Sequence, residues 1–312
     1  MLRLDQLAKA ELVRRLSAEG LRLGTGPLTF CIRSEVPEVW RGLQSLYAEY
    51  PVYDDRHFAD FHVSVDRVGG LRRWVRKQLQ FGVGGTFPFA PLPADQGLPM
   101  LEWGMNWCVS GLYPHFLILH AAVLERNGKA LVMPAPSGSG KSTLCAALLF
   151  NGWRLLSDEL ALIRLDDSQL VPMPRPVSLK NASIAVMQQS AGAKLSIASL
   201  VRDTVKGTVG HFAAPSDAVR RSAEVARPGW IVFPRYQAGA AAALTPFSRA
   251  HTLVRLIENA FNYNVQGEQG FEALANLVEG SECADFSYGS LPQALATFDR
   301  MASGGPLVAG ST

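Results

Sequence analysis

The pattern of hydrophobic and polar positions predicts short strands and amphipathic helices that follow one another in mixed order. Apolar runs and period-two alternation predict strands at residues 27–33, 58–68, 116–123, 130–133, 153–165, 230–236, 244–247 and 285–288. Apolar residues at helical spacing predict helices at residues 1–20, 37–50, 100–112, 144–150, 218–226, 250–261, 270–278 and 291–301. Such mixing of the two element types predicts an α/β fold, in the broad sense that includes α+β.

The dipeptide Asn127-Gly128 lies between two of the predicted strands, where it is a strong signal for a tight hairpin turn. Because a hairpin joins antiparallel strands, a fully parallel sheet does not suit this sequence.

A proline-rich segment at residues 87–99 is the best candidate for a domain boundary. We predict a smaller N-terminal α+β lobe at residues 1–90 and a larger domain at residues 91–303. Residues 304–312 are mostly small, and we expect them to form a disordered tail.

The composition is that of an ordinary globular protein: 312 residues, of which 48% are hydrophobic and 18% charged. A net charge of +3 is too small to indicate a nucleic-acid partner. No apolar stretch is long enough to span a bilayer, and residues 1–20 lack the uninterrupted apolar run of a secretory signal. The four cysteines are scattered, without metal-type spacing. We expect a cytoplasmic protein that binds neither membrane nor nucleic acid.

A glycine-rich turn at residues 135–143 follows an apolar run and precedes an apolar-periodic segment, which is the strand-loop-helix context of a phosphate-binding loop. Gly138 and Gly140 let the backbone N–H groups curl around a phosphate, and the helix start adds its positive dipole end. Lys141 would reach the outer phosphates, and the hydroxyl of Ser142 would ligate Mg²⁺. The motif has Ala135 in place of its first glycine, which is tolerable at negative φ. The predicted nucleotide-binding residues are Ser137, Gly138, Ser139, Gly140, Lys141, Ser142 and Thr143.

Two carboxylates, Asp158 and Glu159, follow the apolar residues of the next predicted strand. Ligands of α/β sheets gather at the carboxyl ends of strands, so Asp158 is expected near the phosphates as a Mg²⁺ ligand or general base. We expect Glu159 and Ser142 to lie nearer the metal ion than Asp158. The structural alternative is that Asp158 caps a turn.

Further cations are candidates for a clamp on the transferring phosphoryl group. Arg175 and Lys180 lie in a proline-rich stretch, and Lys206 and His211 lie in the turn-rich residues 201–215, which we predict to be a loop.

The N-terminal lobe carries a basic stretch in which Trp74 is surrounded by Arg72, Arg73, Arg76 and Lys77. Strand alternation would give it a basic face that selects an acidic or phosphate-bearing partner. The alternative is a solvated strand face with snorkelling side-chain stems.

Three motifs together resemble the HPr kinase/phosphorylase superfamily and, within it, the HprK-related kinase A branch. They are Leu119-His120-Ala121-Ala122, the phosphate loop, and Leu155-Leu-Ser-Asp-Glu-Leu160. The resemblance implies a kinase core similar to that of phosphoenolpyruvate carboxykinase, with the loop in a mixed sheet. It also implies that Lys141 and Ser142 hold ATP and Mg²⁺, and that His120 and Asp158 handle the proton of the acceptor.

Without the resemblance, a lone histidine on an apolar strand is more often a hydrogen-bonded core residue.

Relatives phosphorylate a serine of a precursor peptide or accompany small PqqD-like proteins, and the superfamily often forms homo-oligomers. We therefore expect an ATP- and Mg²⁺-dependent kinase that phosphorylates a hydroxyl group, that of a serine, on a peptide or small protein. The alternatives are a small-molecule phosphoryl transferase of carboxykinase type and a non-catalytic ATP-binding regulatory module.

Overall fold

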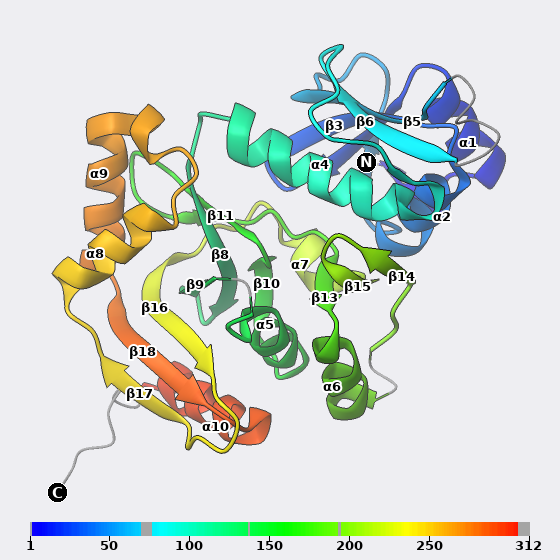
Figure 1. Cartoon of the computed structure of the whole chain (residues 1–312). Coiled ribbons are helices and arrows are strands. Elements are labelled where there is room, and N and C mark those ends of the chain that lie inside the picture. Colours follow the sequence, from blue (N-terminus) through cyan, green and yellow to red (C-terminus); the bar gives the residue numbers. More distant parts are fainter. Residues whose placement is uncertain (1, 70–76, 137, 193–194, 305–312) are drawn as a thin grey trace, which may run out of the picture. The chain divides into compact units, whose positions relative to one another are not determined.

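The chain folds into two compact units, and the backbone passes between them several times (Figure 1). The computed structural model describes residues 2–69, 77–136, 138–192 and 195–304. Unit 1 contains Met1–Leu112, Arg175–Asn181 and Ser196–Val219. Unit 2 contains Tyr113–Pro174, Ala182–Leu195 and Arg220–Thr312. Both units combine helices with sheets, and unit 1 continues well past the boundary predicted near residue 90.

Unit 1 is built on a sheet with strand order β1-β4-β2-β3-β5-β6-β7, as far as the described residues go. Its neighbouring strands are antiparallel, except for the parallel pair β3 and β5. Helices α1 and α4 pack on these strands, and α2 packs against both helices. The elements are β1 (Leu2–Arg3), η1 (Leu4–Gln6), α1 (Lys9–Ser17), β2 (Leu21–Thr25), β3 (Leu28–Arg33), α2 (Pro37–Leu46), β4 (Pro51–Tyr53), β5 (Phe61–Arg67), β6 (Gln78–Val83), β7 (Leu92–Pro93), η2 (Ala94–Gln96) and α4 (Gly97–Leu112).

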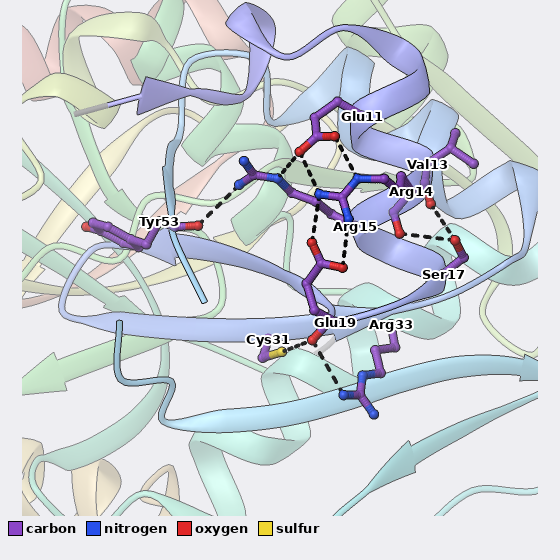
Figure 2. A network of polar contacts seen from close by, with 9 residues as sticks. All are labelled: Glu11, Val13, Arg14, Arg15, Ser17, Glu19, Cys31, Arg33 and Tyr53. Carbon is purple, nitrogen blue, oxygen red and sulfur yellow. Dashed lines mark hydrogen bonds and ion pairs between the residues drawn. The ribbon is translucent and has the colours of Figure 1, made fainter. Parts of the chain in front are cut away.

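Helix α1 carries a network of charged side chains on its exposed side (Figure 2). Arg14 donates to both carboxylate oxygens of Glu11, at 2.8 and 3.0 Å, and also pairs with Glu19. Arg15 donates to Glu11 at 2.7 Å and to the backbone carbonyl of Tyr53 at 3.4 Å. The hydrogen bonds from Arg14 and Arg15 lower the pKa of Glu11 to about 2. The network thus connects α1 to strand β4.

A second, smaller sheet of unit 1 is formed by residues that come much later in the sequence. Its order is β13-β15-β14, and β14 contacts η2. Its elements are β13 (Val177–Lys180), β14 (Ser199–Thr204) and β15 (Gly207–Phe212). The prediction of a loop at residues 201–215 is therefore wrong in large part. Asp203 and Gly207 have φ of 54° and 81°, so the glycine and turn signals belong to a tight connection between two strands.

The side chain of Arg175 is buried in unit 1 and forms an ion pair with Glu102 of helix α4. It also donates to the Glu102 carbonyl at 3.0 Å and to the Asn106 side chain at 2.6 Å. The hydroxyl of Tyr47 donates to the other Glu102 oxygen at 2.6 Å. Burial, followed by the charge of Glu102, raises the pKa of Tyr47 well above its ordinary value, so the hydroxyl stays a donor. These bonds attach Arg175–Asn181, the second stretch of unit 1, to helix α4.

Unit 2 is built on a sheet with strand order β12-β11-β8-β9-β16-β18-β17, and β10 also pairs with β8. Strands β9, β16 and β18 are parallel, and the other pairs are antiparallel, so the predicted mixed sheet is confirmed. The strands are β8 (Leu117–Arg126), β9 (Lys129–Pro134), β10 (Arg154–Ser157), β11 (Leu160–Ile163), β12 (Leu170–Val171), β16 (Arg227–Tyr236), β17 (Ala243–Pro246) and β18 (Glu282–Tyr288). The helices are α5 (Lys141–Phe150), α6 (Ala182–Ala191), α8 (Arg249–Glu258), α9 (Tyr263–Glu279) and α10 (Leu291–Ala302), while the short α7 (Ser216–Arg220) begins in unit 1.

Helices cover both faces of the unit 2 sheet (Figure 1). On one face, α8 and α9 pack over alternate residues of β8, from Leu117 to Val123, in a common hydrophobic core. On the other face, α5 packs on β8, and α10 packs on α5 and β18. Because successive residues of a strand point to opposite faces, the intervening residues of β8 face α5.

The predicted hairpin at Asn127-Gly128 is confirmed, since it joins β8 to β9 with φ of 58° and 76°. A buried ion pair braces it: Arg154 of β10 donates to Glu125 at 2.6 Å, and Glu125 accepts from the Gly128 N–H. The four cysteines are buried and free. No helix in the described ranges is both long and apolar enough to cross a bilayer.

Replacing Arg175 is expected to destabilise the protein strongly. Arg175→Met leaves the Glu102 carboxylate buried without its guanidinium, which costs about 3–5 kcal/mol. Arg164→Met is the control, because its pair with Asp167 is more exposed and such pairs contribute roughly 0–1 kcal/mol. Denaturant unfolding of both variants measures the difference, and similar small losses would contradict the importance of the buried pair.

The α1 network predicts a pH dependence at acid pH. The pKa of Glu11 is lower in the folded chain than its ordinary value of 4.5, so its contribution to stability is complete above that value. It should be lost as the pH falls from 4.5 toward 2. NMR titration should show the low pKa in the parent and a higher one in Arg14→Ala, whereas Arg3→Ala, which removes the separate pair with Asp5, should leave it unchanged.

Candidate functional site

The glycine-rich turn connects β9 to α5, which is the strand-loop-helix arrangement expected from the sequence. Gly138 and Gly140 have φ of 87° and 90°, a region that side chains disfavour. Ala135 is not among the residues with positive φ, so its methyl group brings no such strain. Ser142 is the second residue of α5, and Lys141, its first, is largely buried.

Two tyrosines from neighbouring strand ends hold the second half of this turn. Tyr236 ends β16, and its backbone N–H donates to the carbonyl of Ser139 at 2.9 Å. Tyr288 ends β18, and its hydroxyl donates to the carbonyl of Gly140 at 3.1 Å. A Cβ atom on Gly140 would lie 2.5 Å from the Tyr288 hydroxyl and 2.9 Å from the Tyr236 Cβ. Glycine is therefore required at position 140 both by φ and by space.

Backbone pairing along β8 fixes the place of His120 relative to the turn. Ala121 is paired with Pro134, the last residue of β9, so His120 lies one residue beyond the point where β9 leaves the sheet. The Asn259 carbonyl accepts from the His120 N–H at 2.8 Å and occupies the edge that β9 has left. By strand alternation, the side chain of His120 is on the face covered by α5. Its ring is half-buried and lies 5.9 Å from the ring of Phe261.

Asp158 and Glu159 lie at an interruption in the strand formed by β10 and β11, both of which run antiparallel to β8. Leu160 is paired with His120, and Ser157 with Val123. The Ser157 hydroxyl accepts from the Leu160 N–H at 3.0 Å, and the Glu159 carbonyl accepts from the Ala121 N–H at 3.2 Å. As expected from the sequence, Asp158 directly follows the carboxyl end of β10, and the chain then continues into β11. The register is kept across the break between the two strands, so Asp158 and Glu159 lie on the stretch of backbone that runs along β8 between Val123 and His120.

The thiol of Cys145 in α5 reports on the charges around it. Burial raises its pKa, the charge of Asp158 raises it further, and the charge of Lys141 lowers it. The charges of Asp158 and Lys141 thus act in opposite directions on the same thiol.

The residues present fit a magnesium-nucleotide complex in their chemistry. Mg²⁺ bound with a nucleotide takes one or two protein oxygens and otherwise phosphate and water. Ser142 offers a hydroxyl, and Asp158 and Glu159 offer carboxylates, all of them half-buried. Within the described ranges, no group of three or more His, Cys, Asp or Glu side chains is arranged for a metal ion held by protein alone.

The four candidates for a phosphate clamp all belong to unit 1: Arg175, Lys180, Lys206 and His211. Arg175 is engaged with Glu102, Asn106 and Tyr47, so we assign it to the stability of unit 1 and not to a phosphate clamp. The ammonium group of Lys206 lies 4.7 Å from the centre of the Trp103 ring. Lys180 and His211 lie on β13 and β15, and His211 is buried.

Three predicted features lie wholly or largely outside the described residues. They are Ser137 of the phosphate loop, the basic stretch around Trp74, of which only Lys77 is described, and the tail at residues 304–312, of which only Gly304 is described. Sequence reasoning assigned no role to Tyr288 or Tyr236. The sequence feature that could have pointed to these two residues is that each is an aromatic residue at the end of an apolar strand.

Comparison with known proteins gives one family match. Residues 103–201, from α4 to β14, are similar to the family described as ScmC, SynChlorMet cassette protein ScmC. The match covers less than half of the chain. No curated protein matches it.

The glycines of the loop predict unequal effects of adding a methyl group. Gly138→Ala should cost roughly 1–2 kcal/mol of stability for the left-handed backbone, since no described atom lies within 4 Å of the added carbon. Gly140→Ala should cost about 1–3 kcal/mol more, because it also overlaps Tyr288 and Tyr236. Denaturant unfolding of the two variants tests this, and equal losses would show that the close approach at Gly140 relaxes freely.

Proposed function

We propose that the chain is an ATP- and Mg²⁺-dependent kinase that phosphorylates a hydroxyl, a serine, on a peptide or small protein. The observation that carries the proposal is the register along β8. It pairs His120 with Leu160, the residue after Asp158 and Glu159, one residue beyond the point where β9 enters the phosphate loop. A phosphate cradle, carboxylates for the metal ion and a residue that orients the acceptor hydroxyl are the groups that recur in phosphoryl transfer.

We further propose that unit 2 is a kinase core of the HPr kinase and phosphoenolpyruvate carboxykinase type. The antiparallel pair β8 and β9, which supplies the strand before the loop, supports this over a doubly wound parallel core. The motifs that carry the family resemblance lie on β8, on the loop that follows its partner β9, and from β10 to the start of β11, both of which pair with β8.

The residues divide the work as follows. Backbone N–H groups of the loop and the side chain of Lys141 bind the phosphate chain, and the hydroxyl of Ser142 with Glu159 holds the metal ion. ATP supplies the phosphoryl group, and Mg²⁺ neutralises its charge when bound. Asp158 orients the acceptor hydroxyl and accepts its proton late in the transfer. His120, on the same side of the sheet as α5, donates a hydrogen bond to the transferring group.

A small protein or peptide is the preferred acceptor class. The family that matches residues 103–201 is described as a cassette protein. We therefore take proteins encoded beside this chain, such as a precursor peptide or a small PqqD-like protein, as the first acceptors to test.

Loss of the loop lysine tests nucleotide binding. Lys141→Ala is expected to weaken ATP binding about tenfold or more, because charge-assisted bonds to phosphate contribute roughly 1.5–3 kcal/mol each. Lys129→Ala is the control: it removes the same charge from the opposite end of β9, where the ammonium lies 5.4 Å from the Trp230 ring centre. Calorimetric titration with ATP measures both. Equal affinity of parent and Lys141→Ala would end the phosphate-loop interpretation.

Asp158→Asn tests the chemistry. If Asp158 orients the hydroxyl and takes its proton, turnover should fall roughly 10²–10⁴-fold while Mg·ATP binding persists. If it is a metal ligand, the Mg²⁺ requirement should rise and excess Mg²⁺ should restore part of the rate. Transfer of labelled phosphate from ATP to the acceptor measures this. Nearly full activity in both Asp158→Asn and His120→Ala would refute the centre, and ATP binding without any transfer would favour a regulatory module.

A further inference from the structure

Three parallel strands end at the phosphate loop, and the outermost of them contributes a buried hydroxyl. Strand β9 leads into the loop, β16 lies beside β9, and β18 lies beside β16. Tyr288 is the last residue of β18 and is 1% exposed. Its hydroxyl reaches across the end of β16 to the Gly140 carbonyl, at 3.1 Å.

The hydroxyl of Tyr288 and the backbone of Tyr236 act on two consecutive peptide groups of the loop. In a planar trans peptide, the N–H points opposite to the carbonyl. A Ser139 carbonyl held by the Tyr236 N–H therefore turns the Gly140 N–H the other way. The Gly140 carbonyl accepts from the Leu144 N–H of α5 at 3.0 Å and from the Tyr288 hydroxyl at 3.1 Å, and these two bonds together turn the Lys141 N–H the other way. These are two of the N–H groups with which such a loop surrounds a phosphate.

We propose that Tyr288 is a positioning residue of the phosphate site, whose hydroxyl holds the Gly140 carbonyl so that the Lys141 N–H points at the phosphate chain. This inference rests on the proposed function of the loop. At present the Lys141 N–H donates to the Ser139 hydroxyl at 3.4 Å, a long bond that a phosphate oxygen can replace.

Packing accounts for an aromatic ring at position 288 but not for its hydroxyl. The ring stacks on Phe286 with centres 5.3 Å apart and meets the Tyr236 ring edge-on at 5.6 Å. Phenylalanine would make both contacts. Burial raises the pKa of Tyr288, which keeps the hydroxyl protonated and able to donate.

Tyr288→Phe removes the hydroxyl and keeps the ring. The dissociation constants of ATP and of inorganic tripolyphosphate should both rise, by the same factor of about three to ten. Tripolyphosphate carries the phosphate chain without a nucleoside, so an equal factor locates the effect in the loop. Tyr53→Phe is the control, since it removes the same atom from a ring of unit 1 that stacks on His57, and both constants should stay at the parent values.

The amide resonances of the loop give a second measurement, made on the parent protein and on the variant. Tripolyphosphate should shift the ¹⁵N–¹H resonances of Gly140 and Lys141 in the parent protein, and shift Lys141 less in Tyr288→Phe. An unshifted Lys141 amide in a parent protein that binds tripolyphosphate would overturn the inference.

The outcomes distinguish a failure of this inference from a failure of the proposed function on which it rests. If the parent binds neither ATP nor tripolyphosphate, the proposed function fails. If the parent binds both and Tyr288→Phe binds them equally well, the positioning role is wrong and the function stands. If Tyr288→Phe weakens ATP but not tripolyphosphate, the hydroxyl acts on the nucleoside, and the inference is again overturned.

Discussion

Backbone pairing along β8 is the constraint on which the candidate site depends. A strand has two edges and two faces, and a slip of one residue would exchange the faces of every side chain on it. His120 would then enter the core beneath α8 and α9. The buried pair of Glu125 and Arg154, near the far end of β8, opposes such a slip because it ties the hairpin and β10 to one register. A structural ion pair thus protects the arrangement of the chemical groups.

The features that could be predicted from the sequence depend on residues close together in it. The hairpin follows from Asn127-Gly128, which tolerate positive φ, and the loop follows from Gly138 and Gly140 between a strand and a helix. Most strands and helices of unit 2 were predicted for the same reason, since hydrophobic period is a local property. The hairpin excluded a wholly parallel sheet, and the family resemblance implied the mixed one that is found.

The features that could not be predicted depend on partners far away in the sequence. An arginine near prolines is as suited to a phosphate as to a carboxylate, and the partner of Arg175 lies 73 residues earlier. A carboxylate pair after an apolar run predicts a strand end, as found at Ser157, but not that the strands on both sides of the pair are partners of β8 and place Leu160 opposite His120. The bond from Tyr288 spans 148 residues, and nothing local distinguishes that tyrosine from a core residue.

The interrupted path of unit 1 has a consequence for its synthesis. Glu102 leaves the ribosome well before Arg175, so a nascent chain ending at Leu112 has a carboxylate placed for burial without the guanidinium that compensates it. The last stretch of unit 1 ends at Val219, after the phosphate loop and α5 of unit 2 have already emerged. Unit 1 therefore cannot be complete before Val219 has been synthesised, and unit 2 receives β18 and α10 only after that.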